Sequence, residues 1–224
     1  MALSADAGGP RSTMDRRSRL PSGAGRTVRP RRVPTSSHAT WDALSREIRR
    51  CQLCPLGRTR THAVVYRGSL APRVVFVGEA PGAEEDRTGI PFVGRSGTRL
   101  DAAIRRLGLG PTEYGVLNVL KCRPPGNRFD PRAARTCRPY LDRQLAYLRP
   151  EVLVPLGAVA LRAVAPDAPA VLSAAGRPWT TGPVAVFPLL HPAATLRSRR
   201  WAERWDGDVA ALGAWLSRAP RKPL

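Results

Sequence analysis

The chain has 224 residues, with 37 Lys and Arg against 17 Asp and Glu, which gives a formal net charge of +20 at pH 7. No apolar run approaches the roughly 18 residues of a membrane span, and no apolar stretch follows the N-terminal charges as it does in a secretory signal. We therefore expect an intracellular (cytoplasmic, nucleoid-associated) protein with no membrane partner. Its charge favours a polyanion, most simply nucleic acid, although a GC-rich coding sequence could explain why nearly all the basic residues are arginines.

The N-terminal forty residues differ in composition from the rest of the chain. They hold eight arginines against two aspartates, are rich in Gly, Pro, Ser and Thr, and lack helical or strand periodicity. Such a segment cannot bury enough apolar surface to offset its ordering entropy, so we expect a disordered basic tail over residues 1–40. It is either a tether to DNA or extra sequence before a later start, for which Met14 is a candidate.

From Trp41 onward, apolar residues recur with the periods of regular secondary structure. Trp41, Leu44 and Ile48 are spaced as on an amphipathic helix, and short apolar runs then alternate with further helical patterns. The expected strands cover 73–78, 114–120, 152–156 and 184–190, and the expected helices cover 100–107, 133–148, 158–164 and 201–216.

This alternation predicts an α/β fold for one domain over residues 41–224, which we expect to be monomeric. Strands separated by helices imply a three-layer α/β/α architecture around a central, mostly parallel four-stranded sheet. In such sheets the ligand binds beyond the carboxyl ends of the strands. Functional residues should therefore follow the strands directly.

The four cysteines are spaced like ligands of one metal centre. Cys51 and Cys54 form a C-x-x-C pair, and Cys122 and Cys137 can complete a four-thiolate site. Both zinc and a [4Fe–4S] cluster accept four thiolates, and the spacing does not choose between them. Four unrelated buried thiols would explain the same residues, whereas disulfides are less expected in a chain of this size without a secretion signal.

Polar and aromatic residues follow three of the expected strands. The first strand runs into the turn at 78–82, where Gly and Pro expose backbone N–H groups, and then into three acids at 84–86 and Phe92. The second strand leads to Asn118, and the fourth leads to His191. An amide, an imidazole, an aromatic ring and carboxylates should thus share one edge of the sheet, although each residue alone could cap a turn or fill the core.

Together these segments resemble the iron–sulfur, type-4 uracil-DNA glycosylases. The resemblance rests on GEAPGAEEDRTGIPFVGRSGTRLD at 78–101, NVLKCRPPGNR at 118–128, LHPAA at 190–194 and the spacing of the cysteines. It covers about residues 41–216 and implies a uracil-DNA glycosylase-like fold with uracil-containing DNA, single- or double-stranded, as partner. It also implies a [4Fe–4S] cluster on Cys51, Cys54, Cys122 and Cys137, which would be structural because hydrolysis of a glycosidic bond moves no electrons.

The resemblance further implies roles for the residues at the strand ends. A uracil rotated out of the DNA stack would lie on Phe92, and the Asn118 amide would donate to uracil O4 and accept from N3–H, the reverse of the cytosine pattern. His191 would donate to uracil O2, where negative charge develops during cleavage. The backbone of Glu79 and Ala80 would border the base.

The group that positions the attacking water is less well defined. Other glycosylases of the superfamily carry an Asp where Ala80 stands, and an alanine side chain cannot bind water. The role must pass to Glu79, Glu85, a backbone carbonyl or a substrate phosphate, and we favour Glu85 as a functional carboxylate.

The resemblance also implies that the loop after the His-Pro turn contacts DNA. Leu196 could fill the space that the flipped base leaves, and basic residues next to it could bind phosphates. These basic residues are Arg197, Arg199 and Arg200. A basic, solvated loop without a DNA role would explain the same pattern.

The resemblance thus implies a monofunctional glycosylase that releases uracil and leaves an abasic site in base excision repair. A lyase would need a lysine nucleophile, and Lys121 is the only lysine near these motifs. The alternative is a non-catalytic, zinc- or cluster-stabilised nucleic-acid-binding module. That reading accounts for the charge and the cysteines but leaves Phe92, Asn118 and His191 unexplained.

Overall fold

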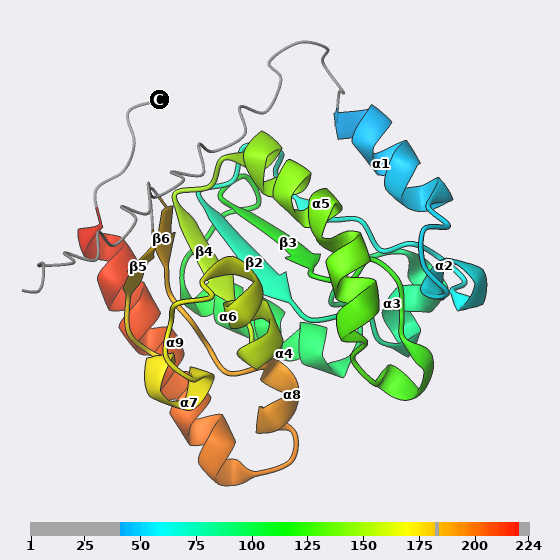
Figure 1. Ribbon diagram of the computed structural model, residues 1–224. Helices are drawn as coiled ribbons and strands as arrows, with labels where there is room; N and C mark the ends of the chain where they lie inside the picture. Colours follow the sequence, from blue (N-terminus) through cyan, green and yellow to red (C-terminus); the bar gives the residue numbers. More distant parts are fainter. Residues whose placement is uncertain (1–40, 182–183, 220–224) are drawn as a thin grey trace, which may run out of the picture. The chain divides into compact units, whose positions relative to one another are not determined.

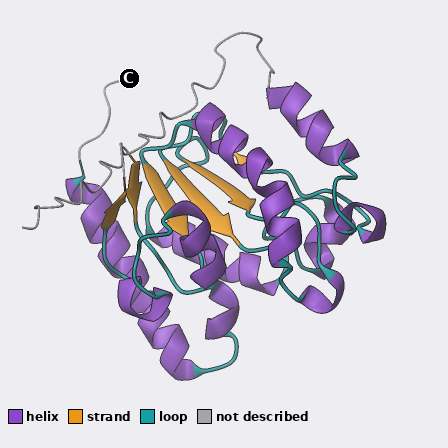
Figure 2. Cartoon of the chain, viewed as in Figure 1, coloured by secondary structure: helices purple, strands orange, loops and turns teal. Residues whose placement is uncertain are grey.

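A computed structural model describes residues 41–181 and 184–219 of the chain. The tail expected over residues 1–40 lies outside the described residues. Within the described part, strands and helices alternate as the sequence predicts (Figure 1, Figure 2). These residues include no helix long and apolar enough to cross a membrane.

The described strands form one six-stranded sheet in the order β1-β3-β2-β4-β6-β5. The strands are β1 (Arg67–Gly68), β2 (Val74–Gly78), β3 (Tyr114–Asn118), β4 (Val152–Pro155), β5 (Trp179–Thr181) and β6 (Val184–Val186). The inner four, β3, β2, β4 and β6, run parallel and confirm the four-stranded core of the prediction. The two outer strands pair antiparallel and were not predicted, because runs of two and three residues leave no periodicity to detect.

Helices cover both faces of this sheet. They are α1 (Trp41–Arg50), α2 (Leu56–Thr59), α3 (Ala83–Thr88), α4 (Arg95–Arg106), α5 (Pro131–Leu148), α6 (Ala158–Val164), α7 (Val171–Ala174), α8 (Pro192–Thr195) and α9 (Arg199–Arg218), with a 3-10 turn at Pro125–Asn127. In Figure 1, α5 and α6 lie in front of the sheet, and α4 and α9 lie behind it. The three-layer α/β/α architecture is confirmed.

The central strand β2 shows why the layers form. All five of its residues are buried, and successive side chains point to opposite faces. Val74 and Phe76 join the core under α4 and α9, whereas Val75 and Val77 join the core under α5 and α6. A strand buried on both faces reads as a continuous apolar run, which is the pattern of the sequence here.

Two expected strands end earlier in the structure. β3 stops at Asn118, although the backbone N–H of Val119 still donates to the Gly78 carbonyl at 2.9 Å. β6 stops at Val186, and Pro188 lacks the N–H that a continuing ladder needs. Beyond it only one parallel bridge remains, between Leu156 and Leu189.

The parallel register brings the ends of these strands to one edge of the sheet. Gly78 at the end of β2 pairs with Asn118 at the end of β3. The Gly157 N–H, just past β4, donates to the Leu189 carbonyl at 2.9 Å, and His191 follows two residues later. This edge is therefore where the predicted polar residues meet.

Candidate active site and cysteine cavity

The Asn118 side chain is buried without a hydrogen-bond partner. Only 1% of the residue is exposed, and neither its amide nitrogen nor its carbonyl oxygen bonds to any described residue. A buried amide left unpaired costs free energy, so such groups are rare in folded proteins unless they serve a ligand. The Asn118 amide presents one donor group and one acceptor that a planar polar ligand could satisfy.

Gly78 leaves the room that the Asn118 amide and the Phe92 ring occupy. A Cβ atom at Gly78 would lie 2.2 Å from the Asn118 side-chain oxygen and 2.6 Å from two ring carbons of Phe92. Real Cβ atoms do not approach other atoms so closely, so only glycine fits here. The close approach places the aromatic ring and the amide next to each other.

Phe92 adopts a backbone conformation that its residue type disfavours. Its φ angle is +56°, in the left-handed region, and only 6% of the residue is exposed, since it packs against the core. A bulky residue with positive φ is an outlier that the surrounding structure must hold in place, and such outliers cluster at functional sites. The next helix approaches closely as well, because a Cβ at Gly97 would lie 1.8 Å from the Phe92 carbonyl oxygen.

Glu85 holds the turn that carries Phe92. One carboxylate oxygen accepts hydrogen bonds from the N–H groups of Val93 and Gly94, at 3.0 and 2.9 Å, and the other accepts from the Gly82 N–H at 3.0 Å. The residue is 9% exposed. Three backbone donors on one buried carboxylate satisfy its charge and join both sides of the turn. From the sequence we favoured Glu85 as a functional carboxylate for the water step. In the structure its hydrogen bonds hold the turn that carries Phe92 in place.

His191 lies beside Phe92, with their ring centroids 6.0 Å apart. It is the N-cap of α8, and its Nδ1 accepts a hydrogen bond from the Ala193 N–H at 3.2 Å. An accepting Nδ1 places the proton of a neutral imidazole on Nε2. Burial lowers the pKa of His191 to about 4, although the Glu85 carboxylate opposes this shift. The ring is therefore neutral near pH 7, with one N–H to donate.

Glu79 and Ala80 follow β2 directly and are half-buried. The Glu79 carbonyl accepts from the Leu120 N–H at 2.9 Å, which fixes its backbone against the segment after β3. Burial raises the pKa of the Glu79 carboxyl group. Ala80 packs against a small apolar cluster that includes Leu120 and Cys122, so this turn adjoins the cysteines as well as Asn118.

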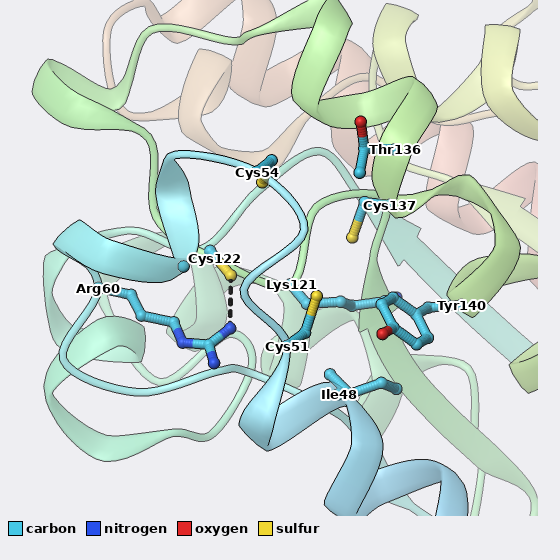
Figure 3. A pocket seen from close by; sticks show the side chains of 10 residues that line it. Ile48, Cys51, Cys54, Arg60, Lys121, Cys122, Thr136, Cys137 and Tyr140 are labelled. Carbon is cyan, nitrogen blue, oxygen red and sulfur yellow. Dashed lines mark hydrogen bonds between the residues drawn. The ribbon is translucent and has the colours of Figure 1, made fainter.

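The four cysteines line a single cavity (Figure 3). Cys51 and Cys54 come from the loop between α1 and α2, Cys122 follows β3, and Cys137 lies in α5. A Cβ at Gly57 would lie 2.8 Å from the Cys51 carbonyl oxygen, so the C-x-x-C turn depends on that glycine. The cavity is small, about 10 Å³, and opens in part to solvent. Within the described ranges no three His, Cys, Asp or Glu side chains converge closely enough to hold a single metal ion.

Two basic side chains face the same cavity. Arg60 donates to the Cys122 sulfur at 2.9 Å, and Lys121 reaches the cavity from the segment after β3. Burial raises the pKa values of the Cys122 and Cys137 thiols, and the positive charges of Arg60 and Lys121, respectively, oppose that rise. Burial likewise lowers the pKa of Lys121 to about 8, while the nearby cysteine thiolates act in the opposite direction.

The expected DNA-contact loop joins α8 to α9 and is exposed. The side chain of Leu196 is 43% exposed at the end of α8, and Arg197 beside it is exposed too. Arg199 and Arg200 already form the first turn of α9, where Arg199 pairs with Glu203 at 2.9 Å and the Arg200 guanidinium stands 5.7 Å from the centre of the Trp201 ring. The loop thus presents an apolar residue among cationic groups.

Comparisons with known proteins agree on one family. The family model of the uracil DNA glycosylase superfamily matches residues 65–210. The type-4 uracil-DNA glycosylase of Thermotoga maritima is 41% identical over 162 residues, which are 70% of this chain and 84% of that protein. The corresponding enzyme of Archaeoglobus fulgidus is 36% identical over 181 residues, 77% of this chain and 91% of that protein. The chain belongs to the type-4 uracil-DNA glycosylases.

A type-5 uracil-DNA glycosylase, that of Pyrobaculum aerophilum, is 36% identical over only 112 residues, 43% of this chain. The longer type-4 matches agree with the family predicted from the sequence. In this type-4 chain the structure brings Phe92, Asn118 and His191 to one edge of the sheet, while the cysteines gather next to it.

Sequence reasoning gave no role to three contributors to these sites. Gly78 permits the contact between Phe92 and Asn118, although the sequence shows it only as the first glycine of the turn at 78–82. Arg60 bonds to a cysteine from a loop that carries no motif. Lys121 was considered only as a lysine near the motifs, and its full burial could not be read from the sequence.

Proposed function

We propose that this chain is a uracil-DNA glycosylase, which flips uracil out of DNA and hydrolyses its N-glycosidic bond to leave an abasic site for base excision repair. The observation that carries the proposal is the unpaired, buried amide of Asn118 beside the Phe92 ring. The similarity to proteins named type-4 uracil-DNA glycosylases supports it. Either single- or double-stranded DNA can deliver a flipped base.

Recognition of uracil follows from the chemistry of the amide. Uracil offers an acceptor at O4 and a donor at N3, and the Asn118 amide can donate to the first and accept from the second. Cytosine offers the reverse pattern, so the same amide would face two mismatched groups. Because burial denies those groups water, the mismatch is costly and excludes cytosine. Phe92 supplies a face on which the flipped base stacks, and the backbone of Glu79 and Ala80 borders it.

His191 supplies the electrostatic part of the reaction. As the glycosidic bond breaks, negative charge grows on the leaving uracil, including its O2 atom. The Nε2–H of a neutral imidazole can donate to that oxygen, and the bond strengthens as the charge develops. Removal of one such donor typically lowers the rate about 10²–10³-fold. The cap on Nδ1 keeps the proton on Nε2 and holds the ring in place.

Two carboxylates remain candidates for the water step. No described residue bonds to the Glu79 carboxylate, and its raised pKa suits a group that exchanges a proton with water. Glu85 already accepts three backbone hydrogen bonds, so we propose that it serves the reaction by holding the Phe92 turn. Glu79 is then the better candidate to position the water.

The cysteines suit a four-thiolate centre such as a [4Fe–4S] cluster. Four thiols from three segments surround one cavity, and two cations there offset the charge of an anionic centre. We propose that Cys51, Cys54, Cys122 and Cys137 hold this cluster. When bound, it would tie α1, the segment after β3 and α5 together without taking part in electron transfer. Iron and acid-labile sulfide in brown protein support the cluster, whereas colourless protein with stoichiometric zinc contradicts it.

The loop after α8 is the proposed contact to DNA. Leu196 can enter the gap that the flipped base leaves, and Arg197, Arg199 and Arg200 can neutralise phosphates on either side. Its exposure and charge support this assignment. Lys121 is buried and so gives no accessible amine for a lyase step, which favours a monofunctional enzyme.

A single-uracil oligonucleotide tests the proposal. We expect the protein to release uracil and to leave a strand that breaks only after alkali treatment, and Asn118→Leu or His191→Ala to lower the rate strongly while the fold is retained. The same oligonucleotide with cytosine is the control substrate. Binding without uracil release would contradict the proposal and favour the non-catalytic binding module. Wild-type rates in both variants would contradict the site assignment alone.

A further inference from the structure

Lys121 is a lysine in a place where lysines are rarely found. Only 1% of it is exposed, and it is among the largest fully buried side chains of the described chain. A buried ammonium is costly unless it is paired or hydrogen-bonded. The groups around the Lys121 ammonium must therefore stabilise its charge.

Those partners lie at both functional sites. The Lys121 ammonium donates a hydrogen bond to the backbone carbonyl of Asn118, and the side chain lines the cysteine cavity (Figure 3). Its backbone hydrogen-bonds to Cys137, and its carbonyl accepts from the Val64 N–H at 2.7 Å. Both its backbone and its side chain are thus fixed between the strand end that carries Asn118 and the sulfur atoms.

We propose that Lys121 is a positioning residue that joins the cysteine cavity to uracil recognition, by placing positive charge beside the sulfur atoms and fixing the Asn118 backbone. The inference rests on the proposed function. An anionic group among the cysteines would hold the ammonium in place, and the ammonium in turn holds the end of β3. Asn118 needs such support because its own side chain gains no hydrogen bond in the free protein.

Arg60 provides a matched comparison. It also gives the cavity a positive charge, through its 2.9 Å bond to the Cys122 sulfur, but its second hydrogen bond goes to the Arg49 carbonyl. Loss of Arg60 therefore removes cavity charge without touching Asn118. The two cations separate the effect of charge from the effect on uracil recognition.

The experiment compares Lys121→Met and Arg60→Met with the wild type, each purified as intact, metal-loaded protein. Iron and sulfide per chain are measured first. Binding is then measured to an oligonucleotide with 2′-fluoro-2′-deoxyuridine, which resists cleavage, and to the same oligonucleotide with deoxycytidine. Methionine matches lysine in volume and carries no charge to desolvate, so we expect the fold to persist, as a melting curve will show. Lys121→Gln is measured in the same way if the methionine variant does not fold.

We expect both variants to retain less iron and sulfide than the wild type. In the loaded fraction, Lys121→Met should lower the ratio of affinities for the uracil and cytosine probes about tenfold, because one hydrogen bond from a charged donor is lost. Arg60→Met should leave this ratio unchanged. Full metal retention or an unchanged preference in Lys121→Met would overturn the inference, as would an equal loss of preference in Arg60→Met. A wild type without preference for uracil would instead refute the proposed function.

Discussion

Replacement of Asn118 by leucine should stabilise the free protein while it abolishes uracil release. The two side chains have the same number of heavy atoms and the same branching, so leucine fills nearly the same space. The Asn118 amide pays a desolvation cost in the free protein because neither polar atom has a partner. Leucine removes that cost and adds apolar contact beside Phe92.

The expected gain can be worked out from the unpaired groups. Each unsatisfied buried polar group costs about 1–3 kcal/mol, so the two unpaired atoms cost about 2–6 kcal/mol, and strain from the rounder leucine side chain offsets part of that relief. A net gain of about 1–3 kcal/mol raises the Tm of a domain of this size by roughly 2–12 °C. Loss of both hydrogen bonds to uracil should lower the rate of release at least about 10²-fold.

Gln144 is the matched control, because it is a second fully buried amide. Its Nε2 donates to the Val65 carbonyl at 2.9 Å, so this amide, unlike that of Asn118, does form a hydrogen bond in the free protein. Its Oε1, however, is buried without a partner among the described residues. Gln144→Met therefore removes one unpaired oxygen while it leaves the Val65 carbonyl without its donor, so we expect the stability to change by less than about 1 kcal/mol. The two substitutions are chemically alike, and only Asn118→Leu is expected to stabilise the protein.

The assay is denaturant unfolding of both variants at equal metal content, together with the rate of uracil release. If Asn118→Leu proves less stable than the wild type at equal metal content, the amide is satisfied in the free protein and the reasoning fails. If it is more stable and still releases uracil at the wild-type rate, the amide is unpaired but does not recognise the base.

Three further substitutions test the other groups of the site. In the folded protein the pKa of His191 is about 4, below its usual value near 6.5. As the pH falls, the unfolded chain therefore binds a proton at this histidine before the folded protein does. The free energy of unfolding then decreases by up to about 1.4 kcal/mol per pH unit between pH 6.5 and pH 4. Unfolding free energies at pH 7 and 4.5 should show this loss in the wild type and not in His191→Asn. Glu85→Gln should destabilise the protein by about 2 kcal/mol in denaturant titrations, because the glutamine N–H₂ group would face backbone N–H groups that need an acceptor. Unchanged stability with lost activity would indicate a direct role of Glu85 in catalysis. Arg197→Ala should lower the salt dependence of DNA binding by about one phosphate contact, whereas Arg143→Ala, which breaks an ion pair with Glu47, should not.

The sheet and the helices that cover it could be predicted, because a strand that is buried on both faces appears in the sequence as a continuous apolar run. Val74 to Val77 form an unbroken apolar run, and the segment from Ala158 to Val164 forms a helix over the predicted residues. The edge strands could not be predicted, because two or three residues at an antiparallel edge depend on the neighbouring strand for their conformation. Arg67 and Gly68 pair only because Gly115 and Val116 already stand in place.

The candidate site was predictable as a set of residue types but not as a geometry. Strand ends in a parallel sheet converge, so Asn118 and His191 could be expected at one edge. The positive φ of Phe92 and the absence of partners for Asn118 arise from tertiary contacts that no local pattern records. Glu85 is an intermediate case, because a glutamate three residues after the Gly82 N-cap is a capping pattern, yet its bonds to the Phe92 turn are not local.

The acidic residues near the site are the exceptions in a strongly basic chain, and two of them, Glu85 and Asp86, are buried. Glu85 binds three backbone N–H groups, and Asp86 accepts from the N–H groups of Thr61 and His62. Their negative charges are thus neutralised by backbone N–H groups and hold loops in place. Glu79 is the one carboxylate of this turn that is half-buried and bonded to no described residue. Burial raises the pKa of that carboxyl group, which is why Glu79, and not Glu85, is the carboxylate we propose for the water step.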